Sequence, residues 1–504
     1  MHHLLRRLLP AALFITTFAS PFDIAAAATS ATAPPRIAGA DLARTAGAIA
    51  AGERLSVTDV ELPATSEVVA LDVQRFDVFA PDAEIVVHGA TGAVKLPAPK
   101  NAYFRGTVAG EAGSRVFLEV LASGETRGIL TRAGDDSYLI DSAERGDTSS
   151  RLQAVRADSA LLKAGRDPWQ CAQDQLPPSP QANAGWDLLA GTAPNALDAS
   201  TVAAAATAAS DPQALPLYAA RVAVETDFEF YSKFNNVTNA TNYVGNLLGY
   251  SSTIYANEIN TALVVQSVSL WTTSSDPWTQ TSTLCGLMEF GRYWNLNRGN
   301  VSRTIAHFMS GKNLGGGIAW IGVLCSGGFG ASASCPGVPT DAAWGGGYGF
   351  TASISGTFNV NNPTVMWDIM AVSHEIGHNF NSPHTHCYAN IGGNSSPIDQ
   401  CYGSETGNGC YAGAGLLPGP AGAGSGTIMS YCHLVRSSYS DISLDFGTGH
   451  PYGVAPGREA ARMSSFVATT AAGNPACLAP AATNAIFSNG FEAGTLGGWS
   501  AKRP

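Results

Sequence analysis

The chain has 504 residues, of which 45 % are hydrophobic and 13 % are charged, and its formal net charge is −11. This length predicts two or three domains, and the apolar share predicts a folded chain. The acidic balance argues against nucleic acid or an anionic membrane as the main partner, since both require clusters of lysine and arginine. No run of 18 apolar residues follows the N-terminus, so we expect no membrane span in the mature protein.

Residues 1–28 have the layout of a secretory signal peptide. Arg6 and Arg7 supply positive charge, Leu8 to Ala19 form a short apolar run, and Ala25 to Ala28 offer small residues for cleavage. This order is typical of an export signal that is removed. We therefore expect a secreted, extracellular protein.

Residues 29–172 are predicted to form a β-rich propeptide domain, with short strand-like runs at 116–120, 127–130 and 137–140. The composition then changes to Pro, Ala, Ser and Thr over 173–214. We interpret this stretch as an exposed linker in which activation cleavage occurs. Its alanine run leaves a helix open as an alternative.

Residues 215–482 alternate between strand and helix patterns. Strands are expected at 221–227, 262–271, 303–311 and 348–356, and helices at 240–260, 284–296 and 365–380. This alternation predicts an α/β layer with a mostly parallel sheet. A glycine loop is expected at 313–325, and it fails the dinucleotide-binding pattern because Trp320 occupies the last glycine position. The tail 483–504 is read as separate, either a sorting or anchoring signal or a disordered end.

Three histidines in the last predicted helix and just after it have the spacing of metal ligands. His374 and His378 are four residues apart, so a helix places both imidazoles on one face. Asn381 suits a left-handed turn and Pro383 prevents the helix from resuming, so the chain can bring back His384 as a third ligand. Three protein ligands with an open fourth position are typical of a catalytic zinc.

Glu375 lies between the first two histidines, where its carboxylate can reach a zinc-bound water without ligating the metal. It could then accept a proton from that water and pass it to a leaving amine, which is the chemistry of a peptide hydrolase. His386 is an alternative third ligand, but its spacing from His378 does not fit the signature. Cys387 is expected in a disulfide rather than on the metal.

Nine cysteines occur, and eight of them lie between positions 285 and 477. In an exported protein these eight predict four disulfides, whose pairing the sequence leaves open. Cys171 is left over, and no CxxC pair occurs. Thioredoxin-like chemistry and cysteine-rich zinc fingers are therefore disfavoured.

The motif HExxHxxxxxH resembles the HExxHxxGxxH signature of the metzincin zinc peptidases. Asn381 stands where that family usually has glycine, and Thr385 stands where one of its groups, the reprolysins, usually has aspartate. Met429, in the sequence GTIMSYC, matches the methionine turn that this family places beneath the metal. Tyr431 lies two residues later and resembles a tyrosine that approaches the metal in the astacin and serralysin groups. It is read as a switchable fifth ligand, an oxyanion donor or a structural residue.

Within the metzincins, the chain is most similar to the adamalysin/reprolysin group with its propeptide. The resemblance implies a metzincin-like α/β catalytic domain, with a mostly parallel twisted sheet, an antiparallel edge strand and an active-site helix, preceded by a β-rich prodomain. It implies that substrate pairs with the edge strand, for which we expect residues 348–356. It also raises the hypothesis that Cys171 blocks the zinc in a precursor, although PWQCAQD lacks the local pattern of reprolysin propeptides. The alternative is an ordinary or intermolecular thiol. The resemblance further implies that calcium binds near Glu225 and Asp227.

The sequence therefore predicts a secreted, zymogen-type zinc endopeptidase, monomeric, with one catalytic zinc and with proteins or peptides as substrates. Two alternatives stay open. One is a non-catalytic adhesion or binding module on a peptidase fold, and the other is a zinc hydrolase that does not act on peptides.

Overall fold

The computed structural model describes residues 34–132, 136–142, 152–157, 169–180, 216–330 and 334–478. The predicted signal peptide, residues 181–214 of the predicted linker and the tail 483–504 lie outside these ranges. Among the described residues, no helix combines the length and the apolar character that a membrane span requires.

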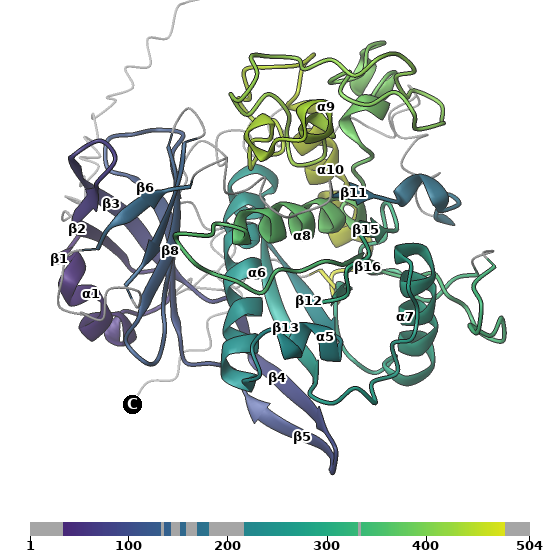
Figure 1. Ribbon diagram of the computed structural model, residues 1–504, viewed down its shortest axis with the longest axis horizontal. Helices are drawn as coiled ribbons and strands as arrows, with labels where there is room; N and C mark the ends of the chain where they lie inside the picture. The colour runs from purple at the N-terminus through teal and green to yellow at the C-terminus, as the bar shows by residue number, and fades with distance from the viewer. Residues whose placement is uncertain are drawn as a thin grey trace, which may run out of the picture. The chain divides into compact units, whose positions relative to one another are not determined.

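A mostly antiparallel sheet forms the β-rich N-terminal region (Figure 1). Its strands, in spatial order, are β1 (Arg36–Ala38), β2 (Arg54–Leu62), β3 (Glu67–Phe76), β6 (Ala102–Val108), β7 (Arg115–Val120), β8 (Thr126–Thr131), β9 (Ser137–Asp141) and β10 (Ala154–Arg156). Apolar side chains alternate between its two faces. Leu118 and Leu130 belong to a core that also includes Leu42 of α1 (Gly39–Thr45). Phe117 and Ile129 belong instead to the main core of the molecule.

The second sheet has the order β11-β15-β16-β14-β12-β13-β4-β5 among the described strands. They are β11 (Gln170–Cys171), β15 (Gly316–Ala319), β16 (Tyr348–Thr351), β14 (Ile305–Met309), β12 (Tyr218–Thr226), β13 (Thr261–Trp271), β4 (Phe79–Gly89) and β5 (Gly92–Pro97). Strands β16, β14, β12, β13 and β4 run parallel to one another, whereas β15 is antiparallel to β16. The mixed sheet with its helices agrees with the predicted α/β class.

The sheet division does not follow the predicted domain boundary. Strands β4 and β5 lie within residues 29–172, but they pair with β13 and extend the second sheet. Trp271 of β13 lies opposite His88 of β4, and the two rings stack with centroids 4.0 Å apart. The N-terminal region therefore supplies these two strands, and β11 as well, to the sheet of the α/β domain.

Helices cover both faces of this sheet. On one face, α6 (Val237–Ile259), α8 (Val365–Asn379) and α10 (Arg458–Gly473) share the main core with inward-facing β12 residues such as Val222. On the other face, α7 (Thr283–Asn297) shares a separate core with Ala223, the next residue along the same strand. This alternation explains why Val222, Ala223 and Val224 are consecutive buried apolar residues, as expected where a strand is covered on both faces.

The expectation that residues 348–356 form the edge strand is wrong. Their ordered part, β16, lies between β14 and β15, and the antiparallel strand beyond it is β15, from the stretch predicted to be a glycine loop. Glycine is required there because a Cβ on Gly316 would lie 1.7 Å from the carbonyl oxygen of Gln170. The glycines thus permit the close approach of another chain segment rather than marking a loop.

The eight cysteines between 285 and 477 form four disulfides, as their number predicted: Cys285–Cys335, Cys325–Cys477, Cys387–Cys410 and Cys401–Cys432. Cys171 is free and buried. Two of the disulfides, Cys387–Cys410 and Cys401–Cys432, join segments next to the predicted site. They hold a loop between 401 and 410 that has little regular structure of its own.

Candidate metal centre

Helix α8 carries the first two histidines on one face. Val365, Ile369, Val372 and Ile376 are fully buried and hold the helix against the core. The Nδ1 atom of His374 donates to the carbonyl oxygen of Ile428 at 2.7 Å, and Nδ1 of His378 donates to that of Ser382 at 2.7 Å. Each ring therefore carries its proton on Nδ1 and leaves Nε2 as a lone-pair donor.

The turn after α8 has the expected left-handed residue. Asn381 has a φ of 77°, which asparagine tolerates better than most residues other than glycine. Arg462 of α10 also donates to the backbone carbonyl oxygen of Asn381 and, at 2.9 Å, to its Oδ1. A helix far along the chain thus holds the turn that places His384.

The structure brings the three histidines together. Nε2 of His384 lies 3.2 Å from Nε2 of His374, and both rings are fully buried. Nδ1 of His384 donates to Glu405 at 2.7 Å, and Nδ1 of His374 donates to Ile428, so each ring presents Nε2 as its lone pair when it acts as a metal ligand. Two lone pairs at this distance repel unless a cation lies between them. Tetrahedral zinc with nitrogen ligands at ~2.0–2.1 Å places such nitrogens about 3.3 Å apart, so the histidines fit zinc.

Burial also favours the neutral form of His374 and His378, which metal ligation requires. Desolvation lowers the pKa of His374 well below its usual value, and the neighbouring His378 and His384 lower it further. Desolvation and His384 lower the pKa of His378 to about 3.

Glu375 is directed into the same pocket. Its side chain is fully buried, and its Oε1 has no hydrogen-bond partner in the described protein atoms. Burial raises the pKa of this carboxyl well above its usual value. A Cβ on Gly317 of β15 would lie 2.3 Å from Oε1, so the glycine provides the room in which the carboxylate sits. An unpaired buried carboxylate oxygen beside three histidines is a candidate proton acceptor.

The segment around Met429 lies beneath the histidines. A Cβ on Gly377, in the helix between His374 and His378, would lie 2.4 Å from the sulfur of Met429. The carbonyl oxygen of Met429 accepts from the backbone N–H of Thr385 at 3.1 Å. The same short segment therefore supports the helix and the strand-like return that carries His384.

Glu405 is a site residue that sequence reasoning missed. Its Oε2 accepts from Nδ1 of His384 and from Nε2 of His386, each at 2.7 Å. His386 thus lies outside the three-histidine cluster and binds this carboxylate. Burial alone would raise the pKa of Glu405, but attraction to His384 and the hydrogen bonds from both rings bring it below its usual value. It lies between Cys401 and Cys410, whose disulfide partners are next to the site, but the sequence gave no pairing from which its position could have been predicted.

Cys171 lies at the fourth position of the cluster. Its sulfur is 3.4 Å from Nε2 of His378 and 3.4 Å from Oε2 of Glu375. The thiol sulfur and one nitrogen from each of the three histidines all lie within 4.8 Å of one another. Zinc–sulfur and zinc–nitrogen bonds of ~2.3 and ~2.05 Å in a tetrahedron separate sulfur from nitrogen by about 3.6 Å. The sulfur–nitrogen distance to His378 and the nitrogen–nitrogen distance between His374 and His384 agree with such a tetrahedron, so the four side chains form a candidate ligand set.

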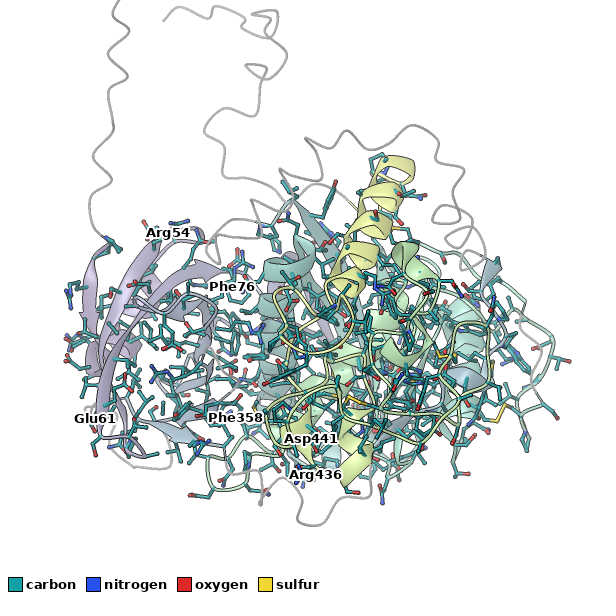
Figure 2. The ribbon with its side chains drawn as sticks, turned by 90° about the horizontal axis from the view of Figure 1, so that it is seen from above. Arg54, Glu61, Phe76, Phe358, Arg436 and Asp441 are labelled. Carbon is teal, nitrogen blue, oxygen red and sulfur yellow. A yellow bond between two sulfur atoms is a disulfide. The ribbon has the colours of Figure 1, made fainter. Side chains whose placement is uncertain are left out.

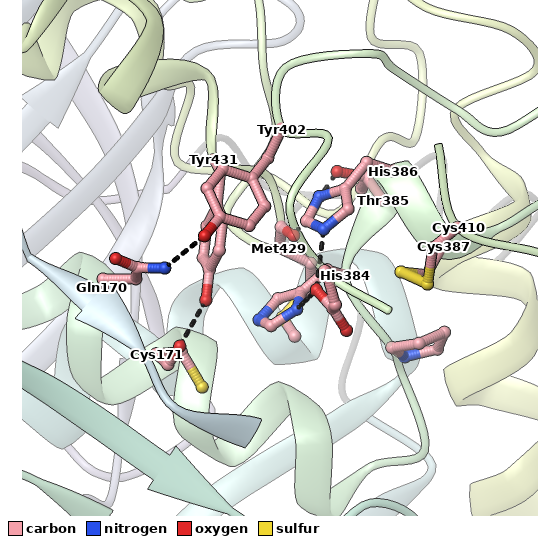
Figure 3. Close-up of polar contacts among 12 residues, drawn as sticks. Gln170, Cys171, His384, Thr385, His386, Cys387, Tyr402, Cys410, Met429 and Tyr431 are labelled. Atoms are coloured by element: carbon pink, nitrogen blue, oxygen red, sulfur yellow. Dashed lines mark hydrogen bonds and ion pairs between the residues drawn. A yellow bond between two sulfur atoms is a disulfide. The ribbon is translucent and has the colours of Figure 1, made fainter. Parts of the chain in front are cut away.

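Several contacts hold the segment that carries Cys171. Strand β11 pairs in parallel with β15, and the backbone N–H of Ala172 donates to Gly317 at 2.9 Å. The hydroxyl of Tyr431 donates to the carbonyl oxygen of Cys171 at 2.6 Å, and Gln170 donates to Tyr402 at 2.8 Å (Figure 3). These contacts place the segment over the histidines, along the edge of the sheet.

The structure does not support the expectation of calcium near Glu225 and Asp227. Glu225 accepts from the indole N–H groups of Trp271 and Trp294 at 2.8 and 3.0 Å. Asp227 caps α5 (Phe228–Ser232) by accepting from the N–H of Phe230 at 2.7 Å. Both carboxylates thus accept hydrogen bonds from the protein itself. These hydrogen bonds explain how two acidic side chains can be buried at the end of this strand.

A mixed sheet, a helix with two histidines, a third histidine beyond a turn and a methionine segment beneath them together define a metallopeptidase of the metzincin type. The family model described as Metallo-peptidase family M12 (Reprolysin_5) matches residues 218–440. This segment therefore resembles the metallopeptidases of that family. No curated protein matches the chain.

One of the solved structures that match is the crystal structure of metalloproteinase-II from Bacteroides fragilis. It is 11 % identical, its TM-score is 0.32, and the match covers 70 % of this chain and 89 % of that chain. A likeness at this level carries no argument about the present protein.

Proposed function

We propose that the protein is a secreted, reprolysin-like zinc endopeptidase made as a silent precursor. Residues 1–28 are the export signal, 29–172 contain the inhibitory N-terminal region, cleavage occurs within 173–214, and 215–482 form the peptidase domain. The four disulfides support an oxidising, extracellular location.

The convergence of three unprotonated Nε2 atoms beside the unpaired Oε1 of Glu375 carries this proposal. His374, His378 and His384 would hold the zinc. When bound, zinc supplies a Lewis acid that polarises a peptide carbonyl and makes water a competent nucleophile near neutral pH. Glu375 accepts a proton from the attacking water and delivers it to the nitrogen of the leaving amine. A non-catalytic module would have no use for an unpaired carboxylate at that place.

The edge of β15 that faces β11 is the proposed substrate site, in place of residues 348–356. Strand β11 now occupies that edge with backbone hydrogen bonds at Gly315 and Gly317. An extended substrate can take over this pairing once the precursor segment has left, because backbone donors and acceptors are shared by all peptides. This supports an endopeptidase that acts on extended protein segments.

Tyr431 is proposed as a donor to the substrate carbonyl. Its hydroxyl already donates to a peptide carbonyl oxygen, that of Cys171. Burial raises the pKa of Tyr431 well above its usual value, with Cys171 and Glu405 adding to the effect, so the hydroxyl keeps its proton. An oxyanion donor requires this protonated form.

The proposed silencing group is the thiol of Cys171. It fills the fourth position of the ligand set and lies against Glu375, so neither water nor substrate can reach the carboxylate. Cleavage after this segment would allow it to leave. The uncleaved chain is therefore expected to be inactive with zinc bound.

The function is tested by casein digestion and zinc content of the processed protein, with and without a chelator. Glu375→Gln is expected to keep its zinc and to lose activity by on the order of 10²–10⁴-fold. Exposed Glu84 provides the control, because Glu84→Gln should digest casein normally. Normal cleavage by Glu375→Gln would refute the assigned mechanism.

Silencing is tested separately with the uncleaved chain. Cys171→Ser should show measurable hydrolysis of a short peptide before any processing, because serine is a poorer zinc ligand than a thiolate. N-terminal sequencing must show that the chain is still intact. An intact Cys171→Ser chain that stays as silent as the wild type would count against the thiol.

A further inference from the structure

The N-terminal region and the peptidase domain share one sheet. Without β4, the eleven-residue strand β13 would be an exposed edge, although all but three of its side chains are buried in the intact chain. Long apolar edges of this kind are avoided in stable proteins because they pair with other chains. The peptidase domain is therefore built to have β4 beside it.

Helix α6 is also shaped to receive the N-terminal sheet. A Cβ on Gly245 would lie 2.7 Å from the hydroxyl of Tyr103, and one on Gly249 would lie 2.6 Å from the ring of Phe117. The two glycines are four residues apart and so lie on one helix face. Glycine costs about 1 kcal/mol relative to alanine within a helix, and here it makes room for aromatic rings from the other domain.

The contact carries matched polar groups as well. Asn101 donates to Asn242 at 3.0 Å, and Thr131 and Tyr250 share a hydrogen bond at 2.9 Å. Figure 2 shows Phe76 on the side of the N-terminal sheet that faces α6, and this ring belongs to the main core with residues of α6 and α8. Separation would leave these donors, acceptors and rings in water on both partners.

The segment that blocks the site is held far less extensively. Strand β11 has two residues, which make the contacts to β15, Tyr402 and Tyr431 given above. Its neighbours add the packing of Trp169 in the main core and hydrogen bonds such as that of Ser179 to Ile321 at 2.6 Å. Activation must move this segment, but nothing in the blocking geometry requires β4 or the N-terminal sheet to move.

We propose that the N-terminal region stays bound after activation, so that the active enzyme is a two-chain complex from which only the segment around Cys171 has been displaced. The β13 edge and the glycine face of α6 form the interaction surface, and its partner is the cleaved N-terminal fragment of this same chain. The proposal rests on the proposed function only for the cleavage within 173–214.

The experiment makes the cut independent of the protein's own activity. A recognition site for an unrelated protease is placed within residues 181–214 of the full chain. The chain is cleaved by that protease and then run on a gel-filtration column at decreasing protein concentrations. Both fragments should elute together down to about 10 nM, as expected for a stable protein interface. Elution as two separate species, with the peptidase fragment folded and active alone, would overturn the proposal.

A variant of α6 tests the interface by the direction of its effect. In a helix whose face is free, Gly249→Ala should stabilise the protein. Against a bound Phe117 ring it should instead weaken retention of the fragment by roughly tenfold or more. Asn239→Ala, at an exposed position of the same helix, is the control and should retain the fragment. Tighter retention in Gly249→Ala would count against the interface.

Casein digestion is measured in parallel, so the two proposals can fail separately. Fragments of the cleaved Cys171→Ser chain that elute together without any activity would contradict the peptidase function and leave the interface standing, because the blocking thiol is absent from them. Activity from a peptidase fragment that has separated from the N-terminal fragment would contradict the interface and leave the peptidase function standing.

Discussion

Replacing Glu405 by glutamine should weaken zinc binding although Glu405 is not one of the proposed ligands. Its Oε2 accepts hydrogen bonds of 2.7 Å from His384 and from His386. A hydrogen bond to a charged acceptor contributes roughly 1.5–3 kcal/mol, against roughly 0.5–1.5 for a neutral one. The bond to His384 therefore loses about 1–2 kcal/mol when the acceptor becomes an amide, which predicts zinc binding about 10-fold weaker, within the range for such supporting residues.

The assay is a competition between the uncleaved protein and a chromophoric chelator, which gives the zinc dissociation constant directly. Thermal unfolding of the metal-free proteins separates positioning from a general structural role. A positioning role predicts that Glu405→Gln shifts the unfolding temperature mainly in the zinc-loaded state. Glu84→Gln is the matched control, because Glu84 is exposed and bonded only to Lys95. Equal zinc affinities for Glu405→Gln and wild type would refute the reasoning.

Three further outcomes are expected. Gly317→Ala should lower casein digestion at least tenfold without loss of zinc, because its Cβ would lie 2.3 Å from Oε1 of Glu375. Unchanged digestion would show that the Glu375 carboxylate can move aside and still act. Asn381→Ala should lower the free energy of unfolding, measured with urea, by about 1–2 kcal/mol, because alanine must adopt a positive φ and cannot accept the hydrogen bond from Arg462. Asn381→Gly should lower it by less, because glycine adopts this φ without strain. Burial raises the pKa of Glu119 to about 7, so the folded state holds its proton more tightly than the unfolded state. Its contribution to stability is therefore complete below about pH 4.5 and declines by about 3 kcal/mol as pH rises past 7. Urea unfolding at pH 5 and 8 should show a smaller decline in Glu119→Gln, and an identical decline would exclude this carboxyl as a cause.

The helix and turn around the histidines could be read from the sequence because their causes are local. The apolar stripe from Val365 to Ile376 sets the helix, and Asn381 with Pro383 ends it. Strand pairing is not local in this way. The N-terminal region was expected to be a β-rich domain of its own, and nothing in its sequence indicated a strand partner outside it, so the joining of β4 to β13 was not foreseen.

The edge strand and the carboxylate at 405 were missed for a related reason. Gly316 and Gly317 lack the side chains that favour strands, and they form β15 because the backbone of Gln170 and the side chain of Glu375 approach them. Glu405 has no fixed spacing from the histidines and is brought to them by disulfides whose pairing only the fold decides. Both features depend on contacts between distant parts of the chain.

The hydrogen bonds from Arg462 to Asn381 also have a consequence for the order in which parts of the site are synthesised. Arg462 follows Asn381 by 81 positions, whereas Cys171 precedes His378 by 207. A growing chain therefore exposes its blocking segment long before the support for the third histidine has been made. If the thiol blocks the site as proposed, the inhibitory segment is already synthesised when the active site becomes complete. The producing cell is then protected from proteolysis during translation and not only afterwards.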